Sequence, residues 1–224
     1  MRKLIIAIDG PSGAGKGTIA RSISQALGYR HVDTGAMYRA VAWKALQGGV
    51  SFENEPAVAA VATSANIQVE GGVVTIDGAD VTTAIRTPEI DRAATAVARL
   101  PRVRQELVGR QRAMAGEGGV VMEGRDIGTV VFPQADVKIY LDASAEERAR
   151  RRVNDPAHTG GRVGQAAVAQ AIADRDMSDS TRPVSPLMVA ADAIRIDTTA
   201  MSIEEVVAQV MEIVRARAST NGDL

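Results

Sequence analysis

The chain has no cysteine and few aromatic residues, and each shortage excludes a class of protein. Without cysteine, its 224 residues form no disulfide, no thiolate metal site and no cysteine nucleophile, which is compatible with a reducing cytosol. The two histidines, His31 and His158, leave little for a zinc site, and we expect neither to be catalytic. Aromatic residues make up 3% of the chain and the formal net charge is -1, so neither base stacking nor a basic field indicates nucleic-acid binding.

Long apolar runs are absent as well. Asp9 interrupts the aliphatic residues at the start of the chain and no small-residue cleavage site follows, so this segment does not match a signal peptide. No other stretch approaches the length that spans a membrane. We therefore expect a cytoplasmic protein with no membrane partner, and the lack of a long heptad pattern favours a monomer over a coiled-coil dimer.

Short aliphatic runs alternate with helical patterns over most of the chain. Residues 4–8 form a continuous aliphatic run, typical of a strand buried on both faces, and the helix after the next turn is expected to end at Gly28. Further buried strands are expected in the segments GGVVMEG and ADVKIYLDA, and a last strand is expected in DAIRIDTT. Residues 144–147 and 202–205 match the capping box, which predicts two helix starts. This alternation predicts an α/β fold with a doubly wound parallel sheet flanked by helices.

Two regions interrupt this alternation. Residues 66–83 alternate polar and apolar side chains around two glycine-containing turns, which predicts a small antiparallel meander inserted into the core. Residues 153–186 are rich in Gly, Asp, Arg and Pro, and we expect them to form a mobile flap. Residues from Ser219 onward are expected to be disordered.

These patterns describe one unit of residues 1–224 with two additions to its core. The core is expected to comprise about residues 1–62, 85–152 and 187–218, the β insertion about residues 63–84, and a helical lid about residues 153–186. Pro88 and Pro101 each stand at an expected first helical position, which predicts two more helices after the insertion.

Residues 10–16 match the first seven positions of the phosphate-binding pattern G-x-x-x-x-G-K-[ST], between an expected strand and an expected helix. The glycines let backbone N–H groups turn inward around an anion, and the helix N-terminus adds partial positive charge. Lys16 is expected to contact the β- and γ-phosphates of ATP and is a candidate catalytic residue. The expected nucleotide-binding residues are Gly10, Pro11, Ser12, Gly13, Ala14, Gly15, Lys16, Gly17 and Thr18.

The position after Lys16 departs from this pattern, because Gly17 stands there and the hydroxyl follows at Thr18. Mg²⁺ is expected to accompany ATP, but either Thr18 or the phosphates and water can supply its ligands, so no metal ligand is assigned. A glycine-rich turn with a surface lysine is the alternative explanation of the whole motif. The strand-turn-helix context argues against it.

Polar residues also follow other strands, at what should be the same edge of the sheet. They are Asp33, Thr34, Gly35 and Arg39 after the second strand, Glu123, Arg125 and Asp126 after another, and Arg175, Asp179 and Arg182 in the flap. The carboxyl ends of parallel strands form the ligand-binding edge of such sheets. A second group of cations at this edge indicates an anionic acceptor held against the γ-phosphate, as a kinase requires.

Each group also has an ordinary explanation. A single arginine is commonly a surface residue in a salt bridge, and residues 33–35 are also typical of a turn and helix cap. Glu123 either positions a metal or a water or makes a structural hydrogen bond, and the sequence leaves both open. For Arg125, directly after an aliphatic strand, the position favours a functional role.

Several longer segments resemble those of bacterial cytidylate kinases, which belong to the nucleoside monophosphate kinases. They are IDGPSGAGKGT, DTGAMYR, AIRTPEI, LPRVRQELVGRQR, EGRDIGTVVFPQADVKIYLDAS and RPVSPL, and they extend from the first strand to the last helix. GRDIGTVVFP together with PRVR is more specific than the phosphate loop, which many families share. The resemblance implies phosphorylation of CMP and dCMP by MgATP in direct in-line transfer, on a P-loop core with a monophosphate-binding insertion and a lid.

The resemblance also implies roles for individual residues. Arg39, Arg125 and Arg175 would hold the acceptor phosphate and act with Lys16 in catalysis. The base-reading residues would be Thr95, Arg104 and Asp126, and Asp179 with Arg182 would contact the sugar hydroxyls. Asp126 is able to accept from the exocyclic amine of cytosine while Arg104 donates to its ring acceptors.

Two features depart from the family pattern. Thr34, also expected to bind substrate, and Thr95 stand where the family often has serine, which keeps the hydroxyl and adds a methyl group. The flap sequence differs most, so no adenine contacts are carried over to it.

Two other functions are compatible with the residues. One is a kinase for a different small anionic acceptor, which acceptor choice would distinguish. The other is a non-enzymatic nucleotide switch, against which the second group of cations argues, because a switch holds no acceptor phosphate.

Overall fold

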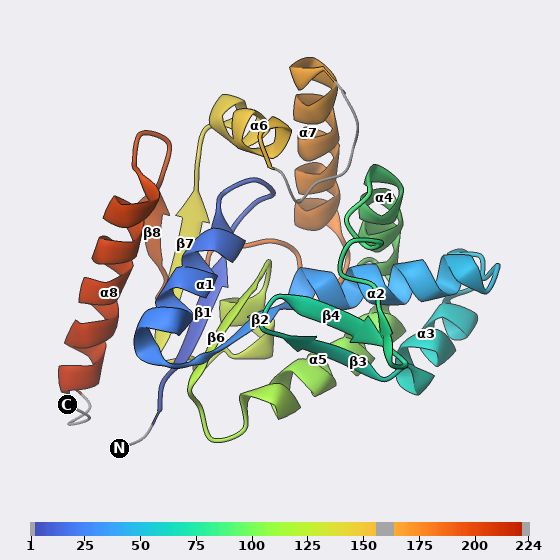
Figure 1. Cartoon of the computed structure of the whole chain (residues 1–224), viewed down its shortest axis with the longest axis horizontal. Helices are drawn as coiled ribbons and strands as arrows, with labels where there is room; N and C mark the ends of the chain where they lie inside the picture. The colour runs from blue at the N-terminus through green and yellow to red at the C-terminus, as the bar shows by residue number, and fades with distance from the viewer. Residues whose placement is uncertain (1–2, 156–163, 221–224) are drawn as a thin grey trace.

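The structure is a computed structural model, and it describes residues 3–155 and 164–220. Its centre is a parallel sheet in the order β2-β6-β1-β7-β8. The strands are β1 (Ile5–Asp9), β2 (Arg30–Asp33), β6 (Val120–Gly124), β7 (Val137–Asp142) and β8 (Ile194–Asp197). The predicted parallel α/β sheet is therefore confirmed, with β1 in the middle (Figure 1).

Both faces of the central strands β1, β6 and β7 are covered, which is why these strands are largely apolar at successive positions, whereas the edge strands β2 and β8 are partly exposed. On β1, Ile6 and Ile8 pack on the face covered by α1 (Lys16–Leu27) and α8 (Ile203–Thr220). Ala7 points to the other face, where α5 (Pro101–Ala115) and a short π-helical turn, η1 (Ile127–Val131), cover it. The sheet is thus doubly wound, as predicted.

A second hydrophobic cluster lies beside the sheet. It joins α2 (Thr34–Gln47), α3 (Glu55–Ser64) and α4 (Pro88–Val97) to a small antiparallel sheet of β3 (Ile67–Glu70), β4 (Val73–Ile76) and β5 (Ala79–Asp80). The predicted antiparallel meander and the two proline-initiated helices α4 and α5 are confirmed. The helix cap considered for residues 33–35 is present, because Asp33 accepts from the Ala36 N–H at 3.1 Å at the start of α2, whereas α3 was not predicted.

The two predicted capping boxes differ in the structure. At Ser202 both arms are present, because Glu205 N–H donates to the Ser202 hydroxyl at 3.2 Å and Ser202 N–H donates to the Glu205 carboxylate at 2.8 Å. At Ser144 only the first arm forms, since Ser144 N–H donates instead to Thr199 and the Glu147 carboxylate pairs with arginines. The Ser144 box is therefore half formed.

Residues 153–186, expected to form a mobile flap and a helical lid, contain the helix α7 (Gln165–Thr181). It packs against α6 (Ala145–Val153), and the two stand beyond the carboxyl ends of the strands (Figure 1). We refer to α6, most of which falls in the expected core, and α7 as the lid helices; that they act as a lid, the lid bounds 153–186 and its mobility stay predictions. The expected disorder from Ser219 onward was wrong for its first residues, because α8 continues to Thr220. His158 lies outside the described residues.

Across the described ranges, no helix combines the length and the apolar composition needed to cross a bilayer.

Candidate active site

A cavity of about 720 Å³ lies at the carboxyl ends of the strands. The loop between β1 and α1 lines it through residues 12–18, opposite the arginines Arg39, Arg125 and Arg175. These arginines come from α2, the end of β6 and α7, so the fold gathers them from three distant parts of the chain. All four candidate catalytic cations, with Lys16 as the fourth, therefore face one space.

Lys16 is a buried cation at the first position of α1. Its Nζ donates to the carbonyl of Pro11 at 2.7 Å, and only 7% of the residue is exposed. Burial, with Arg125 and Arg175 nearby, holds the pKa of Lys16 well below its ordinary value, although Glu123 opposes this shift. An incoming polyanion would relieve this repulsion among cations.

The lid helices contact the backbone of the phosphate loop directly. The N–H of Ser12 donates to Asp176 on α7 at 3.0 Å, and Arg148 on α6 donates to the Ser12 carbonyl at 3.0 Å. Arg148 and Asp176 also form an ion pair with each other. Behind the loop, Gly10 lies against β7, because a Cβ there would be 2.0 Å from the Leu141 carbonyl oxygen.

Glu123 is the next-to-last residue of β6 and lies beside the start of α1. Its Oε1 lies 3.0 Å from His31 Nε2, and a Cβ on Gly17 would lie 3.1 Å from the same oxygen. A side chain after Lys16 would therefore have to displace the Glu123 carboxylate by a few tenths of an ångström. The structural hydrogen bond expected as one alternative for Glu123 is present, and a metal or water role stays a prediction.

The three phosphate-binding candidates are held by carboxylates in the structure. Arg39 Nε donates to Asp91 at 3.1 Å, Arg175 lies 3.4 Å from the same oxygen, and Arg125 Nε donates to Asp179 at 2.9 Å. Burial, followed by the nearby Arg125 and Arg39, lowers the pKa of Arg175 to about 10. Arg175 Nε is buried without a hydrogen-bond partner in the part of the chain that the structure describes. All three arginines are therefore paired with carboxylates, and Arg175 keeps one donor atom unused.

The base-reading candidates form a second, enclosed cluster behind Arg125. Asp126 pairs with Arg104 and, at 3.2 Å, with Arg182, which lies 3.8 Å from Asp179. All four residues are almost fully buried. Among the described residues, Arg104 Nε and Arg182 NH2 have no partner in good hydrogen-bond geometry, although each arginine is ion-paired. The cluster therefore presents a carboxylate beside unused donors.

The structure does not bring every candidate into this cluster. The hydroxyl of Thr95 donates to the Asp91 carbonyl within α4, and among the described residues no hydrogen bond joins it to Arg104 or Asp126. Thr34 donates to the Glu123 carbonyl at 2.7 Å, so its hydroxyl holds the end of β6. The substrate contacts assigned to both threonines stay predictions.

Two acidic residues that sequence reasoning missed organise the site. Asp9 accepts from the N–H groups of Ile127 and Gly128 at 2.8 and 2.7 Å, which fixes the turn directly after Asp126. Burial raises the pKa of Asp9 to about 6, although the two N–H donors oppose this. The sequence did contain a signal for Asp9, because this acid directly follows the aliphatic run of residues 4–8. Asp91, on α4, carried no such signal.

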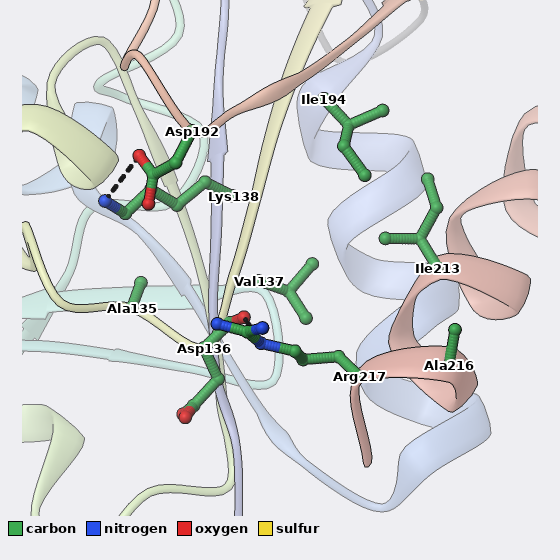
Figure 2. Close-up of a pocket in the computed structure, with 9 residues that line it drawn as sticks. All are labelled: Ala135, Asp136, Val137, Lys138, Asp192, Ile194, Ile213, Ala216 and Arg217. Atoms are coloured by element: carbon green, nitrogen blue, oxygen red, sulfur yellow. Dashed lines mark hydrogen bonds and ion pairs between the residues drawn. The ribbon is translucent and has the colours of Figure 1, made fainter. Parts of the chain in front are cut away.

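A smaller cavity of about 420 Å³ lies between β7, β8 and α8 (Figure 2). It opens beside Val137, the first residue of β7, and so lies at the strand end opposite to the phosphate loop. Its charged groups are engaged, since Lys138 pairs with Asp192 at 2.8 Å and Arg217 donates to the Asp136 carbonyl at 3.0 Å. The phosphate-loop residues 12–18 and the arginines Arg39, Arg125 and Arg175 line the larger cavity.

Comparison with known sequences agrees with this arrangement. A sequence model of the family described as cytidylate kinase matches residues 6–216. The cytidylate kinase of Desulfitobacterium hafniense (strain Y51) is 49% identical over 222 residues, which cover 98% of this chain and 96% of that protein. The cytidylate kinase of Pelotomaculum thermopropionicum is 52% identical over 216 residues, which cover 94% of this chain and 96% of that protein.

Solved structures of low sequence identity share the fold. A gluconokinase from Sinorhizobium meliloti 1021 superposes with a TM-score of 0.52 at 13% identity, covering 98% of this chain and 97% of its own. A shikimate kinase from Bacteroides thetaiotaomicron gives a TM-score of 0.52 at 11% identity, covering 95% and 98%. At such identities the likeness concerns the fold alone.

Proposed function

The chain belongs to the cytidylate kinase family, whose members phosphorylate CMP with ATP, and from this premise we propose that it converts both CMP and dCMP by direct in-line phosphoryl transfer. The bond between the γ-phosphorus and the β–γ bridging oxygen breaks as an oxygen of the acceptor phosphate bonds to that phosphorus. The products are ADP and CDP or dCDP. The observation that carries the proposal is the single cavity in which Lys16 faces Arg39, Arg125 and Arg175.

The donor phosphates would lie along residues 12–18, whose backbone N–H groups and helix N-terminus favour an anion. Lys16 would stabilise charge on the transferred group, because it is buried close to the loop and its charge is poorly compensated. The donor nucleoside would lie beside Arg151 and the loop after β8, where Met201 and Ile203 supply apolar surface to the same cavity.

The acceptor phosphate would bind Arg39, Arg125 and Arg175, displacing the carboxylates that pair with them in the structure. An anion that is already ionised needs no general base, so positioning and charge stabilisation suffice for transfer. This accounts for an active site whose candidate catalytic groups are all cations.

The cytosine edge would be read by Asp126 and Arg104, which pair side by side and so present an acceptor beside donors. Cytosine offers an amine next to a ring nitrogen and a carbonyl, which complements that order. Uracil reverses the first two groups, so the buried carboxylate would face a carbonyl oxygen. Because the cluster is enclosed, Arg182 on the lid side would have to move for the base to enter.

The residues at the loop fit Mg²⁺ held largely by phosphate oxygens and water. In the described ranges, no three His, Cys, Asp or Glu side chains are grouped as a metal site. Thr18 and Glu123 border the cavity and are the groups that would hold the ion, Glu123 from the end of β6. When bound, Mg²⁺ neutralises charge on the β- and γ-phosphate oxygens.

A coupled assay of ADP release tests the proposal with CMP, dCMP, UMP, AMP and GMP offered separately, beside a control without acceptor. Rapid release with CMP and dCMP, weaker with UMP and negligible with the purines, is the expected result. Release that ignores the acceptor would instead indicate a hydrolase or a switch. A preference for another acceptor would overturn the assignment of the base-reading cluster.

Specificity is tested separately by Asp126→Ala and by the better-matched Asp126→Asn, with Asp174→Ala on exposed α7 surface as control. Loss of the carboxylate should narrow the ratio of kcat/KM for CMP over UMP by about tenfold or more. The control should leave that ratio unchanged. An unchanged ratio in a folded Asp126→Asn protein would remove Asp126 from the base-reading role.

A further inference from the structure

One carboxylate, that of Asp91 on α4, pairs with arginines from three other helices. Its Oδ1 accepts from Arg39 of α2 at 3.1 Å and lies 3.4 Å from Arg175 of α7, while its other oxygen pairs with Arg152 of α6. The side chain of Asp91 is 15% exposed and those of the three arginines are 16–19% exposed. The pairs are therefore mostly shielded from water. Ionic contacts in such a partly buried place are stronger than contacts at a fully exposed surface.

Two of these arginines belong to the predicted acceptor-phosphate site. Arg39 and Arg175 both line the cavity that contains the phosphate loop. Like charges held this close repel, and the pKa of Arg175 is lowered by burial first and then by Arg125 and Arg39. For Arg39, burial also lowers the pKa but Asp91 and Asp33 outweigh it, so the net shift is upward. Asp91 is thus a principal anion that holds Arg39 beside Arg175 when no phosphate is bound.

The contacts of Asp91 also join separate parts of the fold. α4 follows the antiparallel insertion on the acceptor side, whereas α6 and α7 form the lid (Figure 1). A single side chain therefore links the acceptor side to both lid helices at the position where a phosphate would be bound.

We propose that Asp91 is a positioning residue that holds Arg39 and Arg175 ready for the acceptor phosphate and ties the lid helices to α4 through Arg152. When the nucleotide phosphate binds, Arg39 and Arg175 would pair with the phosphate in place of Asp91. Asp91 would stay paired with Arg152. This inference rests on the proposed function, since it assigns a supporting residue to the acceptor-phosphate site.

The test is Asp91→Asn, which keeps the shape of the side chain and removes its charge. Its matched control is Glu89→Gln, an exposed acid on the same helix. We expect KM for CMP to rise about tenfold, while kcat and KM for ATP stay within about threefold, because none of the three arginines that pair with Asp91 belongs to the phosphate loop, residues 10–18. Arg152→Gln, which removes the α6 contact of Asp91 together with one cation from the cavity wall, should raise KM for CMP by less than Asp91→Asn does, because Arg39 and Arg175 keep their carboxylate.

A structural role would give a different pattern. If Asp91→Asn left KM for CMP within twofold of wild type, or lowered kcat and raised both KM values together with a drop in Tm, the proposal would be overturned. Should that variant fail to fold, Asp91→Glu keeps the charge and shifts it by one methylene. It should raise KM for CMP about threefold, and an unchanged value would overturn the proposal as well. Wild-type protein that transfers nothing to CMP would instead refute the proposed function itself.

Discussion

The donor and acceptor sides of the cavity are constructed differently. The proposed site for the donor phosphates is one unbroken segment, residues 10–18, which runs from the end of β1 into α1. The acceptor side draws its cations from α2, the end of β6 and α7, and its carboxylates from α4 and α7. A local segment is able to encode its own geometry through glycines and a helix N-terminus, whereas a dispersed site depends on every element that positions it.

The contrast has limits, because the local segment is not fully independent. The lid residues Arg148 and Asp176 bind the backbone of Ser12, and Glu123 at the end of β6 borders Gly17. The donor loop therefore has a locally encoded shape and a tertiary environment that restricts which residues it tolerates.

The largest effect is expected for Lys16→Met. Removing the Lys16 ammonium from the proposed donor-phosphate site should lower kcat on the order of 10³-fold. The negative charge that develops on the transferred phosphoryl group would then lose a stabilising cation. If the two sides act separately, the ratio of activities with CMP and dCMP will stay the same, which steady-state kinetics with both acceptors measures. Thermal unfolding serves as the control for folding. A kcat within tenfold of wild type would contradict the catalytic role of Lys16.

A second prediction concerns Asp9, which precedes the donor loop yet binds the turn after Asp126 on the acceptor side. Its folded pKa of about 6 lies above the ordinary value of 3.8, so its contribution to stability is fully present below pH 3.8 and is lost as the pH rises through about 6. The loss should reach about 3 kcal/mol. Urea unfolding of wild type and Asp9→Asn between pH 4 and pH 7 measures it.

The quantity to follow is the difference in unfolding free energy between these two proteins. Asp33 and Asp179 have lowered pKa values and stabilise the fold above their ordinary pKa, in the opposite direction to Asp9. Both proteins carry these groups, so their effect cancels in the difference. A difference that does not change with pH would show that Asp9 titrates normally and couples the two sides only weakly.

The smallest expected effect is the difference between Gly13→Ala and Gly28→Ala in the free energy of unfolding that each variant loses. Both glycines have positive φ, 79° and 65°, but a Cβ on Gly13 would lie 2.8 Å from the Arg148 carbonyl oxygen of α6, whereas Gly28 faces open space. Gly28→Ala should lower the free energy of unfolding by about 1 kcal/mol, because alanine is strained in the left-handed backbone conformation at this position. Gly13→Ala should cost about 2 kcal/mol more, because backbone must move. Equal losses in chemical denaturation would mean that the loop is shaped locally after all.

Most elements of the fold were predictable because their patterns are local. Buried parallel strands, the glycine turns of the meander and the prolines before α4 and α5 each leave a signal within a few residues. α7 was expected only as part of a helical lid and without bounds of its own, since a segment with few apolar residues gives little periodicity until it packs against α6. The Ser144 box was half wrong because nearby arginines and Thr199 competed for its two arms.

The same division applies to the site. Sequence alone determined the parallel α/β class, the position of the phosphate loop and the family, because each rests on residues adjacent in the chain. Only the tertiary structure decided that Asp91 holds Arg39 and Arg175, that Asp9 fixes the turn after Asp126, and that Thr95 bonds within its own helix. Charges from distant elements choose their partners by distance and burial, and both exist only once the sheet and its helices have packed.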